Sequence, residues 1–147
     1  MSQSGSIRAA TGIAFLVCCL VAGCGDQKTA RVSGTVTFKG QPLPAGKIYF
    51  MPDTAKSNTG QPGYADIKNG RYDTAAPGGQ AAVSGHMIVA ISGVDPSAKP
   101  EKASGDVTAK SLFERYETAT ELSGADSTKD FDVPADAGKG PAKNTGP

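Results

Sequence analysis

The chain has 147 residues, with 15 basic and 14 acidic side chains, a formal net charge of +1 and no tryptophan. This length suits a single domain, and no internal shift in composition marks a second one. The balanced charge argues against the basic field of a nucleic-acid-binding protein, and the few aromatic residues argue against a dominant aromatic binding hot spot.

The N-terminus has the layout of a secretory signal peptide. Residues 1–10 carry one charge, Arg8, and residues 13–22 are continuously apolar up to Gly23. A basic start, an apolar run of about 7 to 15 residues and a small-residue cleavage site define such a signal, whereas a membrane-spanning helix needs about 20 apolar residues. We therefore predict that residues 1–23 are a signal peptide rather than a permanent membrane span or a buried strand.

A cysteine closes this segment after an aliphatic residue and two small ones, in the order Val21-Ala22-Gly23-Cys24. The stretch resembles the lipobox of bacterial lipoproteins, and the Ala-x-Ala cleavage site of an ordinary secreted protein is absent from the region. Each buried CH₂ of an added acyl chain such as palmitate contributes about 0.8 kcal/mol, and more than one chain anchors a protein stably. The sequence therefore predicts lipidation of Cys24 and a lipid bilayer as a partner.

Lipidation would place the domain outside the cytoplasm, in the periplasm or elsewhere in the cell envelope. In some bacteria an aspartate directly after the lipidated cysteine retains the protein in the inner membrane. Here Gly25 holds that place, which favours the outer membrane. Cys18 and Cys19 leave with the signal, so the mature chain is expected to contain neither a disulfide nor a thiolate metal site.

Residues 24–30 are small and polar, and they predict a flexible tether. Residues 31–39 alternate polar and apolar side chains, which is the period of a half-buried strand. Two prolines and flanking glycines make residues 40–46 a turn, and residues 47–51 form a second predicted strand that ends at Pro52.

Residues 53–62 are predicted to form a loop, because turn-forming residues gather there. A hairpin is predicted over residues 64–73, centred on Asn69-Gly70, because both residues tolerate the positive φ of a type I′ turn. Residues 75–85 are interpreted as a linker. Residues 86–92 are expected to form a central strand, with the core-facing side chains Met87, Val89 and Ile91.

The C-terminal third contains weaker patterns. Residues 95–110 are predicted to be a loop, and residues 118–122 a short strand. Residues 111–119 are predicted to contain one or two helical turns, because apolar side chains recur there at helical spacing, at Leu112, Phe113, Tyr116 and Ala119. A last strand is expected over residues 128–133, and residues 135–147 are predicted to be a disordered tail.

About seven short strands separated by glycine and proline turns, without βαβ alternation, predict an all-β antiparallel sandwich over residues 31–134. The segment Val32–Phe38 and the following residues 40–52 resemble the opening of carboxypeptidase-regulatory-like, or transthyretin-like, domains of small bacterial lipoproteins. Later segments follow in that family's order, at residues 67–72, 86–93, 113–116 and 131–133. The resemblance implies a seven-stranded prealbumin-like sandwich that acts as an accessory or adhesion-type module rather than as the active part of an enzyme. Residues 75–85 depart from the family, because they exceed its usual Pro-Gly turn.

Candidate chemistry is sparse. His86 is the only histidine, so a multi-histidine metal site is excluded, and no nucleophile elbow supports a triad with Ser84 or Ser92. We expect no enzyme activity, no cofactor and no metal. Ligand contacts are predicted at Tyr64, Tyr72 and His86, with ordinary cross-strand pairing of the tyrosines, including Tyr49, as the alternative.

Four aspartates near the C-terminus leave calcium open as a hypothesis, because calcium prefers several oxygen ligands. The alternative is that acids alternate outward along the last strand. These residues are Asp126, Asp130, Asp132 and Asp136. The sequence as a whole predicts an anchored, non-enzymatic domain that binds an envelope protein or has a structural role. The alternative is an accessory module for a small ligand or a polysaccharide.

Overall fold

In a computed structural model, the described residues (28–98, 101–103, 106–108 and 110–137) form an all-β fold with no α-helix. Its one helical turn in this range is the 3₁₀ turn η1, Thr54–Lys56. None of the helices described is long and apolar enough to cross a membrane. The strands are β1 Thr29–Ala30, β2 Val32–Phe38, β3 Gln41–Pro42, β4 Ala45–Pro52, β5 Gly63–Lys68, β6 Arg71–Asp73, β7 Ala82–Val83, β8 Gly85–Asp95, β9 Glu101–Ala103, β10 Asp106–Thr108, β11 Lys110–Leu122, β12 Ser127–Thr128 and β13 Phe131–Val133.

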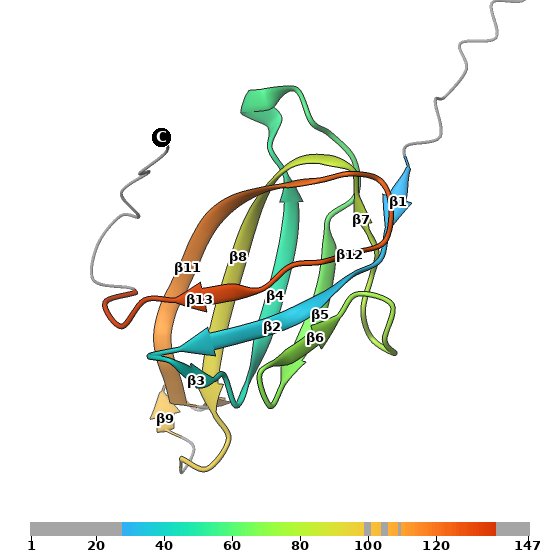
Figure 1. Ribbon diagram of the computed structural model, residues 1–147. Helices are drawn as coiled ribbons and strands as arrows, with labels where there is room; N and C mark the ends of the chain where they lie inside the picture. The colour runs from blue at the N-terminus through green and yellow to red at the C-terminus, as the bar shows by residue number, and fades with distance from the viewer. Residues whose placement is uncertain (1–27, 99–100, 104–105, 109, 138–147) are drawn as a thin grey trace, which may run out of the picture.

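One curled sheet dominates, with the strand order β11-β8-β4-β5-β6-β2-β12, and β3 and β13 also pair with β2. The curl places β2, β6 and β13 over β4, β8 and β11, so the molecule is sandwich-like, as predicted (Figure 1). Most pairs are antiparallel, but β12 and β13 run parallel to β2. The predicted last strand is thus two short pieces, β12 and β13, on either side of Lys129 and Asp130.

The core lies between these layers, and its placement follows from side-chain alternation. Val32 and Val36 of β2 and the predicted trio Met87, Val89 and Ile91 of β8 are all fully buried, which confirms their predicted orientation. An aromatic triangle fills the space between the layers, with ring centroids 5.9 to 6.3 Å apart, and consists of Phe50, Tyr72 and Phe131.

The Asn69-Gly70 hairpin is confirmed. Lys68 and Arg71 pair across the turn, and φ is 50° at Asn69 and 73° at Gly70, as a type I′ turn requires. The loop predicted over residues 53–62 is also present, apart from η1.

The helical turns predicted for residues 111–119 are wrong, because this segment belongs to the long strand β11. Two register shifts against β8, between Ser111 and Phe113 and between Phe113 and Tyr116, interrupt the alternation and imitate helical spacing. The strand predicted over residues 118–122 is the second half of β11.

The other corrections concern pairing that local composition does not reveal. The tether predicted over residues 24–30 is too long, because Thr29–Ala30 already form β1, paired with Val83 and Ala82. The linker predicted over residues 75–85 contains β7 and a bridge between Gln80 and Tyr64. The loop predicted over residues 95–110 contains the paired strands β9 and β10.

Candidate functional site

The structure does not assemble Tyr64, Tyr72 and His86 into one site. Tyr72 points into the core and is 4% exposed, and its hydroxyl donates a hydrogen bond to the main-chain oxygen of Lys129 at 2.7 Å. Burial raises the pKa of this hydroxyl, and the nearby charge of Asp130 adds to the effect. Tyr72 is therefore a structural residue in this fold rather than an exposed ligand contact.

Tyr64 lies on the opposite, solvent-facing side of the sheet. It is the cross-strand neighbour of Tyr49, with ring centroids 6.1 Å apart. Beside this pair Lys47 and Asp66 form an ion pair at 3.3 Å, which raises the pKa of Lys47. Pairs of this kind stabilise sheets routinely. The cross-strand interpretation therefore fits Tyr49 and Tyr64, whereas Tyr72 lies on the other face.

His86 stands at the beginning of β8, opposite Glu121 of β11, with 3.9 Å between Nδ1 and the carboxylate oxygen. Its main-chain oxygen accepts hydrogen bonds from the main-chain N–H of Asp53 and from the side-chain amide of Asn58. Ser92 lies six residues further along the same strand, about 20 Å away. Ser84 lies just before β8, and its main-chain N–H donates to Lys28.

Three of the four aspartates considered for calcium are engaged with β2 or with Arg31 just before it. Asp126 accepts from the main-chain N–H of Arg31, Asp130 from both N–H and hydroxyl of Thr35, and Asp132 from the hydroxyl of Thr37. Each pair is separated by 95 residues, which reflects the parallel register of β12 and β13 on β2. Among the described residues, no group of three or more acidic, histidine or cysteine side chains could hold a metal ion. Asp136 is exposed and follows β13.

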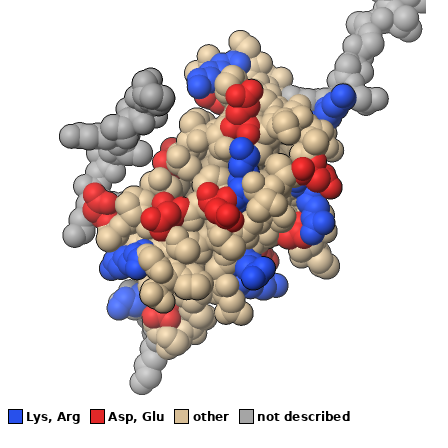
Figure 2. Space-filling model, in the orientation of Figure 1, with Lys and Arg blue, Asp and Glu red and all other residues tan. Residues whose placement is uncertain are grey.

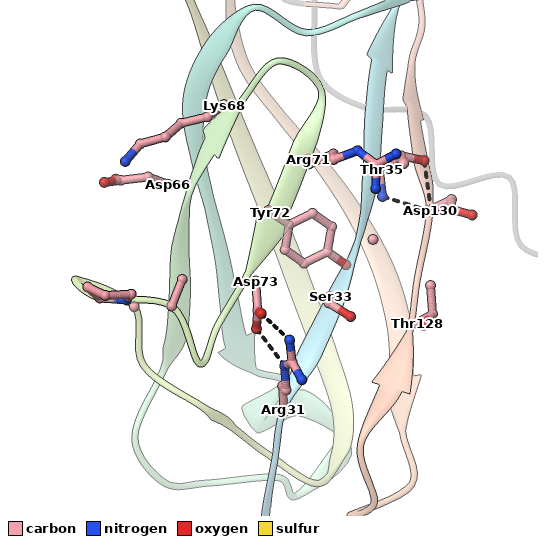
Figure 3. A pocket seen from close by; sticks show the side chains of 14 residues that line it. Arg31, Ser33, Thr35, Asp66, Lys68, Arg71, Tyr72, Asp73, Thr128 and Asp130 are labelled. Atoms are coloured by element: carbon pink, nitrogen blue, oxygen red, sulfur yellow. Dashed lines mark hydrogen bonds and ion pairs between the residues drawn. The ribbon is translucent and has the colours of Figure 1, made fainter.

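A shallow depression on the outer face of the sheet is the main candidate binding site. It has a volume of about 690 Å³ and lies over β2, β5, β6 and β12, with Ala76, Pro77 and Gly79 at its rim. Hydroxyl and charged side chains line it together, and these are Ser33, Thr35, Thr128, Arg31, Asp66, Lys68, Arg71, Asp73 and Asp130 (Figure 3). The buried Tyr72 also belongs to its lining.

Some charges in this depression are committed to partners. Arg31 and Asp73 face each other in a two-bond ion pair (Figure 3). The hydrogen bond from Arg31 is the main reason why the pKa of Asp73 lies below its usual value, and the pair raises the pKa of Arg31. Hydrogen bonds from Thr35 lower the pKa of Asp130 in the same way.

Lys68 and Arg71 differ from these groups, because both are exposed and neither takes part in the ion pairs and side-chain hydrogen bonds found among the described residues. Two cations beside three hydroxyls suit a ligand rich in oxygen, such as an acidic sugar. Of the three predicted ligand contacts, Tyr72 belongs to the lining of this depression, whereas Tyr64 and His86 do not. The sequence did not predict the exposed polar side chains of the depression. A usable signal was the alternation that turns Ser33 and Thr35 outward, together with the hairpin that places Arg71 beside Thr35.

Cys24, the predicted lipidation site, lies outside the described residues.

The chain matches no protein-family model, no curated protein and no solved structure.

Proposed function

We propose that this chain is a membrane-anchored lipoprotein of the bacterial cell envelope, whose β-sandwich has a non-enzymatic binding or structural role. The observation that carries the proposal is the Val21-Ala22-Gly23-Cys24 motif at the end of a short apolar segment, followed within five residues by the first strand, β1. In this arrangement the acylated cysteine comes directly before the folded domain. The resemblance of residues 31–134 to carboxypeptidase-regulatory-like domains fits the same role.

Metabolic labelling with a clickable palmitate analogue in a bacterial host tests the anchor. The wild-type chain and Cys18→Ser should incorporate the label, because Cys18 is removed with the signal. Cys24→Ser should lose the label and the membrane fractionation. Label retained by Cys24→Ser, or absent from the wild type, would refute lipidation at Cys24.

The free edge of β11 supports the binding role. Within the described residues β11 pairs with β8 alone and ends the sheet. Its second half, from Tyr116 to Leu122, keeps an unbroken register on β8, so its outer main-chain groups form a regular row. An extended segment of an envelope protein can add to such a row as a further strand.

A photo-crosslinking amino acid placed at Ala119 tests this edge. Ala119 is exposed on β11, whereas Tyr49 is exposed on β4 in the middle of the sheet, outside the depression, and supplies the matched control. We expect a discrete crosslinked adduct in intact cells at position 119 and none at position 49. Adducts of equal yield at both positions would contradict binding through the edge.

The alternative function, a small-ligand or polysaccharide module, is favoured by the depression with its free Lys68 and Arg71. Glucuronate is a suitable probe, because it presents a carboxylate and several hydroxyls. Chemical-shift titration should show binding to the wild type and a clear loss for Arg71→Ala, with Arg115→Ala on the distant β11 as control. Equal titration of both variants would remove this alternative.

A further inference from the structure

The first strand of the domain is held close to the proposed anchor. The main-chain N–H of Ser84 donates to the oxygen of Lys28 at 3.0 Å, and β1 then pairs with β7. Ala30 is 2% exposed. The chain is therefore part of the folded domain from Lys28 onward.

The distance from the anchor is limited by covalent geometry. Four residues lead from Cys24 to Lys28, and an extended chain spans at most about 3.6 Å per residue. The two Cα atoms are thus no more than about 14 Å apart in any conformation. If Cys24 is acylated, as the proposed function on which this inference rests requires, the Lys28 end of the domain must lie close to the lipid headgroups.

Short distances between side-chain positions identify the segments that surround Lys28. A Cβ added to Gly124 would lie 3.6 Å from the Cβ of Lys28 and 3.2 Å from that of Ser84, so the β11–β12 turn adjoins the start of β1. A Cβ added to Gly85 would lie 3.1 Å from the side chain of Asn58, which belongs to the β4–β5 loop. These loops gather at one end of the sandwich, and β3 and β9 lie at the other (Figure 1).

The surface of this end suits a contact with headgroups rather than insertion into hydrocarbon. Lys28 and Lys56 are exposed, and basic side chains appear over η1 and beside the start of β1 in Figure 2. The same segments hold two acids, but Asp53 caps η1 and Asp126 accepts from the main-chain N–H of Arg31, so both carboxylates are engaged within the domain. The one exposed large apolar side chain in the described part of the chain is Tyr49, on the outer face of β4 rather than in these loops. Lysines near a membrane are attracted to anionic lipid phosphates.

We propose that the end formed by Lys28, residues 53–62 and residues 123–126 rests on the headgroup layer of the membrane that holds Cys24, with Lys28 and Lys56 facing lipid phosphates. β8 has 11 residues, so the opposite end is about 35 Å farther along the strands. The outer depression and the β11 edge then run along the sides of the domain and stay open to the envelope.

Site-directed quenching tests this orientation. Acylation occupies Cys24, so an introduced cysteine is the sole free thiol of the mature chain. Thr54→Cys in η1 and Gln41→Cys in β3 are exposed positions at opposite ends. Each variant is labelled with a fluorophore and reconstituted in phosphatidylcholine and phosphatidylglycerol vesicles that carry a headgroup quencher. We expect about threefold or greater excess quenching at position 54, given the reach of about 14 Å and the strand length of about 35 Å.

The outcomes separate the orientation from the anchor. Protein that fails to float with the vesicles would count against lipidation itself. Protein that floats but is quenched equally at both positions, or more at position 41, would overturn the orientation and leave the anchor standing. Lys56→Glu should weaken quenching at position 54 at low salt, whereas Lys39→Glu, the same change beside β3, should not. Equal effects of the two changes would refute the lysine contact.

Discussion

The carboxylate of Asp130 replaces a main-chain acceptor for Thr35. Its Oδ1 atom accepts from the N–H of Thr35 at 2.7 Å and from the hydroxyl at 2.8 Å. In the parallel pairing just before this point, Lys129 donates its N–H to Ser33, and a regular ladder would return the N–H of Thr35 to the carbonyl of Lys129. That carbonyl instead points inward and accepts the hydroxyl of Tyr72. The N–H of Thr35 and the carbonyl of Lys129 thus both have hydrogen-bond partners where the chain passes from β12 to β13.

The bond between Asp130 and Thr35 predicts a pH effect on stability. The pKa of Asp130 in the folded protein lies below the ordinary value of 3.8, so the carboxylate stabilises the fold above that pH. This contribution is lost as the pH falls below 3.8 through the folded-state pKa. Asp130→Asn should lower the urea midpoint near neutral pH and flatten its acid dependence, so that the two curves converge as the pH falls below 3.8. Asp136→Asn, the same charge change at an exposed acid that follows β13, is the matched control. Parallel curves for wild type and Asp130→Asn would contradict the prediction.

Removal of the Tyr72 hydroxyl should destabilise the protein. Tyr72→Phe leaves the inward carbonyl of Lys129 without its donor, and an unsatisfied buried acceptor costs about 1 to 3 kcal/mol. Tyr116→Phe is the matched control, because Tyr116 is half-buried on β11 and its hydroxyl makes no hydrogen bond among the described residues. Urea denaturation should therefore separate the two variants. Similar losses in both would show that the bond to Lys129 contributes little.

Gly34 makes the inward turn of Lys129 sterically acceptable. A Cβ at this position would clash with the carbonyl group of Lys129, which is backbone and cannot rotate away. Gly34→Ala should thus lower the free energy of unfolding by about 2 kcal/mol or more and loosen β12 and β13. Hydrogen exchange at Thr35 should rise with it. Gly40→Asn is the control, because nothing lies within 4 Å and asparagine tolerates the φ of 73° there. A Gly34→Ala variant as stable as this control would refute the clash.

The sequence predicts those parts of the fold that depend on a regular side-chain period or on a short turn motif. The alternation over residues 31–39, the Asn69-Gly70 turn and the buried trio of β8 follow from strand period and turn chemistry alone. β11 was missed because two bulges shift its phase, so the apolar spacing of residues 112–119 matches a helix. β1 was missed because a two-residue strand has no period of its own.

The candidate site depends on the pairing of β2, near the start of the domain, with β12, near its end. Pairing between such distant segments is not visible in the local sequence pattern of either one. A signal does exist, because Arg31 just before β2, and Thr35 and Thr37 on β2, repeat the spacing of the three aspartates that bind them, 95 residues later in each case. The burial of Tyr72 could also have been predicted from the sequence. Ile67 and Tyr72 stand symmetrically about the Asn69-Gly70 turn and so share one face, and Ile67 is plainly apolar.

The same turn yields a last prediction. Asn69 adopts a φ of 50°, a conformation that costs an alanine about 1 kcal/mol and a glycine little. The main-chain N–H groups of Asn69 and Gly70 donate to Pro44 and Leu43 at 2.9 and 2.7 Å, and these bonds do not depend on the side chain. Asn69→Ala should therefore lose about 1 kcal/mol of unfolding free energy, whereas Asn69→Gly should stay near wild type.

Gly70→Ala should be the most damaging change in this turn. Its φ is 73°, and an added Cβ would lie 2.6 Å from the Cβ of Pro42, so conformational cost and steric clash act together. Urea midpoints of the three variants should fall in the order Asn69→Gly, Asn69→Ala, Gly70→Ala. If Asn69→Ala matched Asn69→Gly, positive φ would not be the reason for asparagine at position 69. If Gly70→Ala were no worse than Asn69→Ala, the expected clash with Pro42 of β3 would not contribute to the loss of stability.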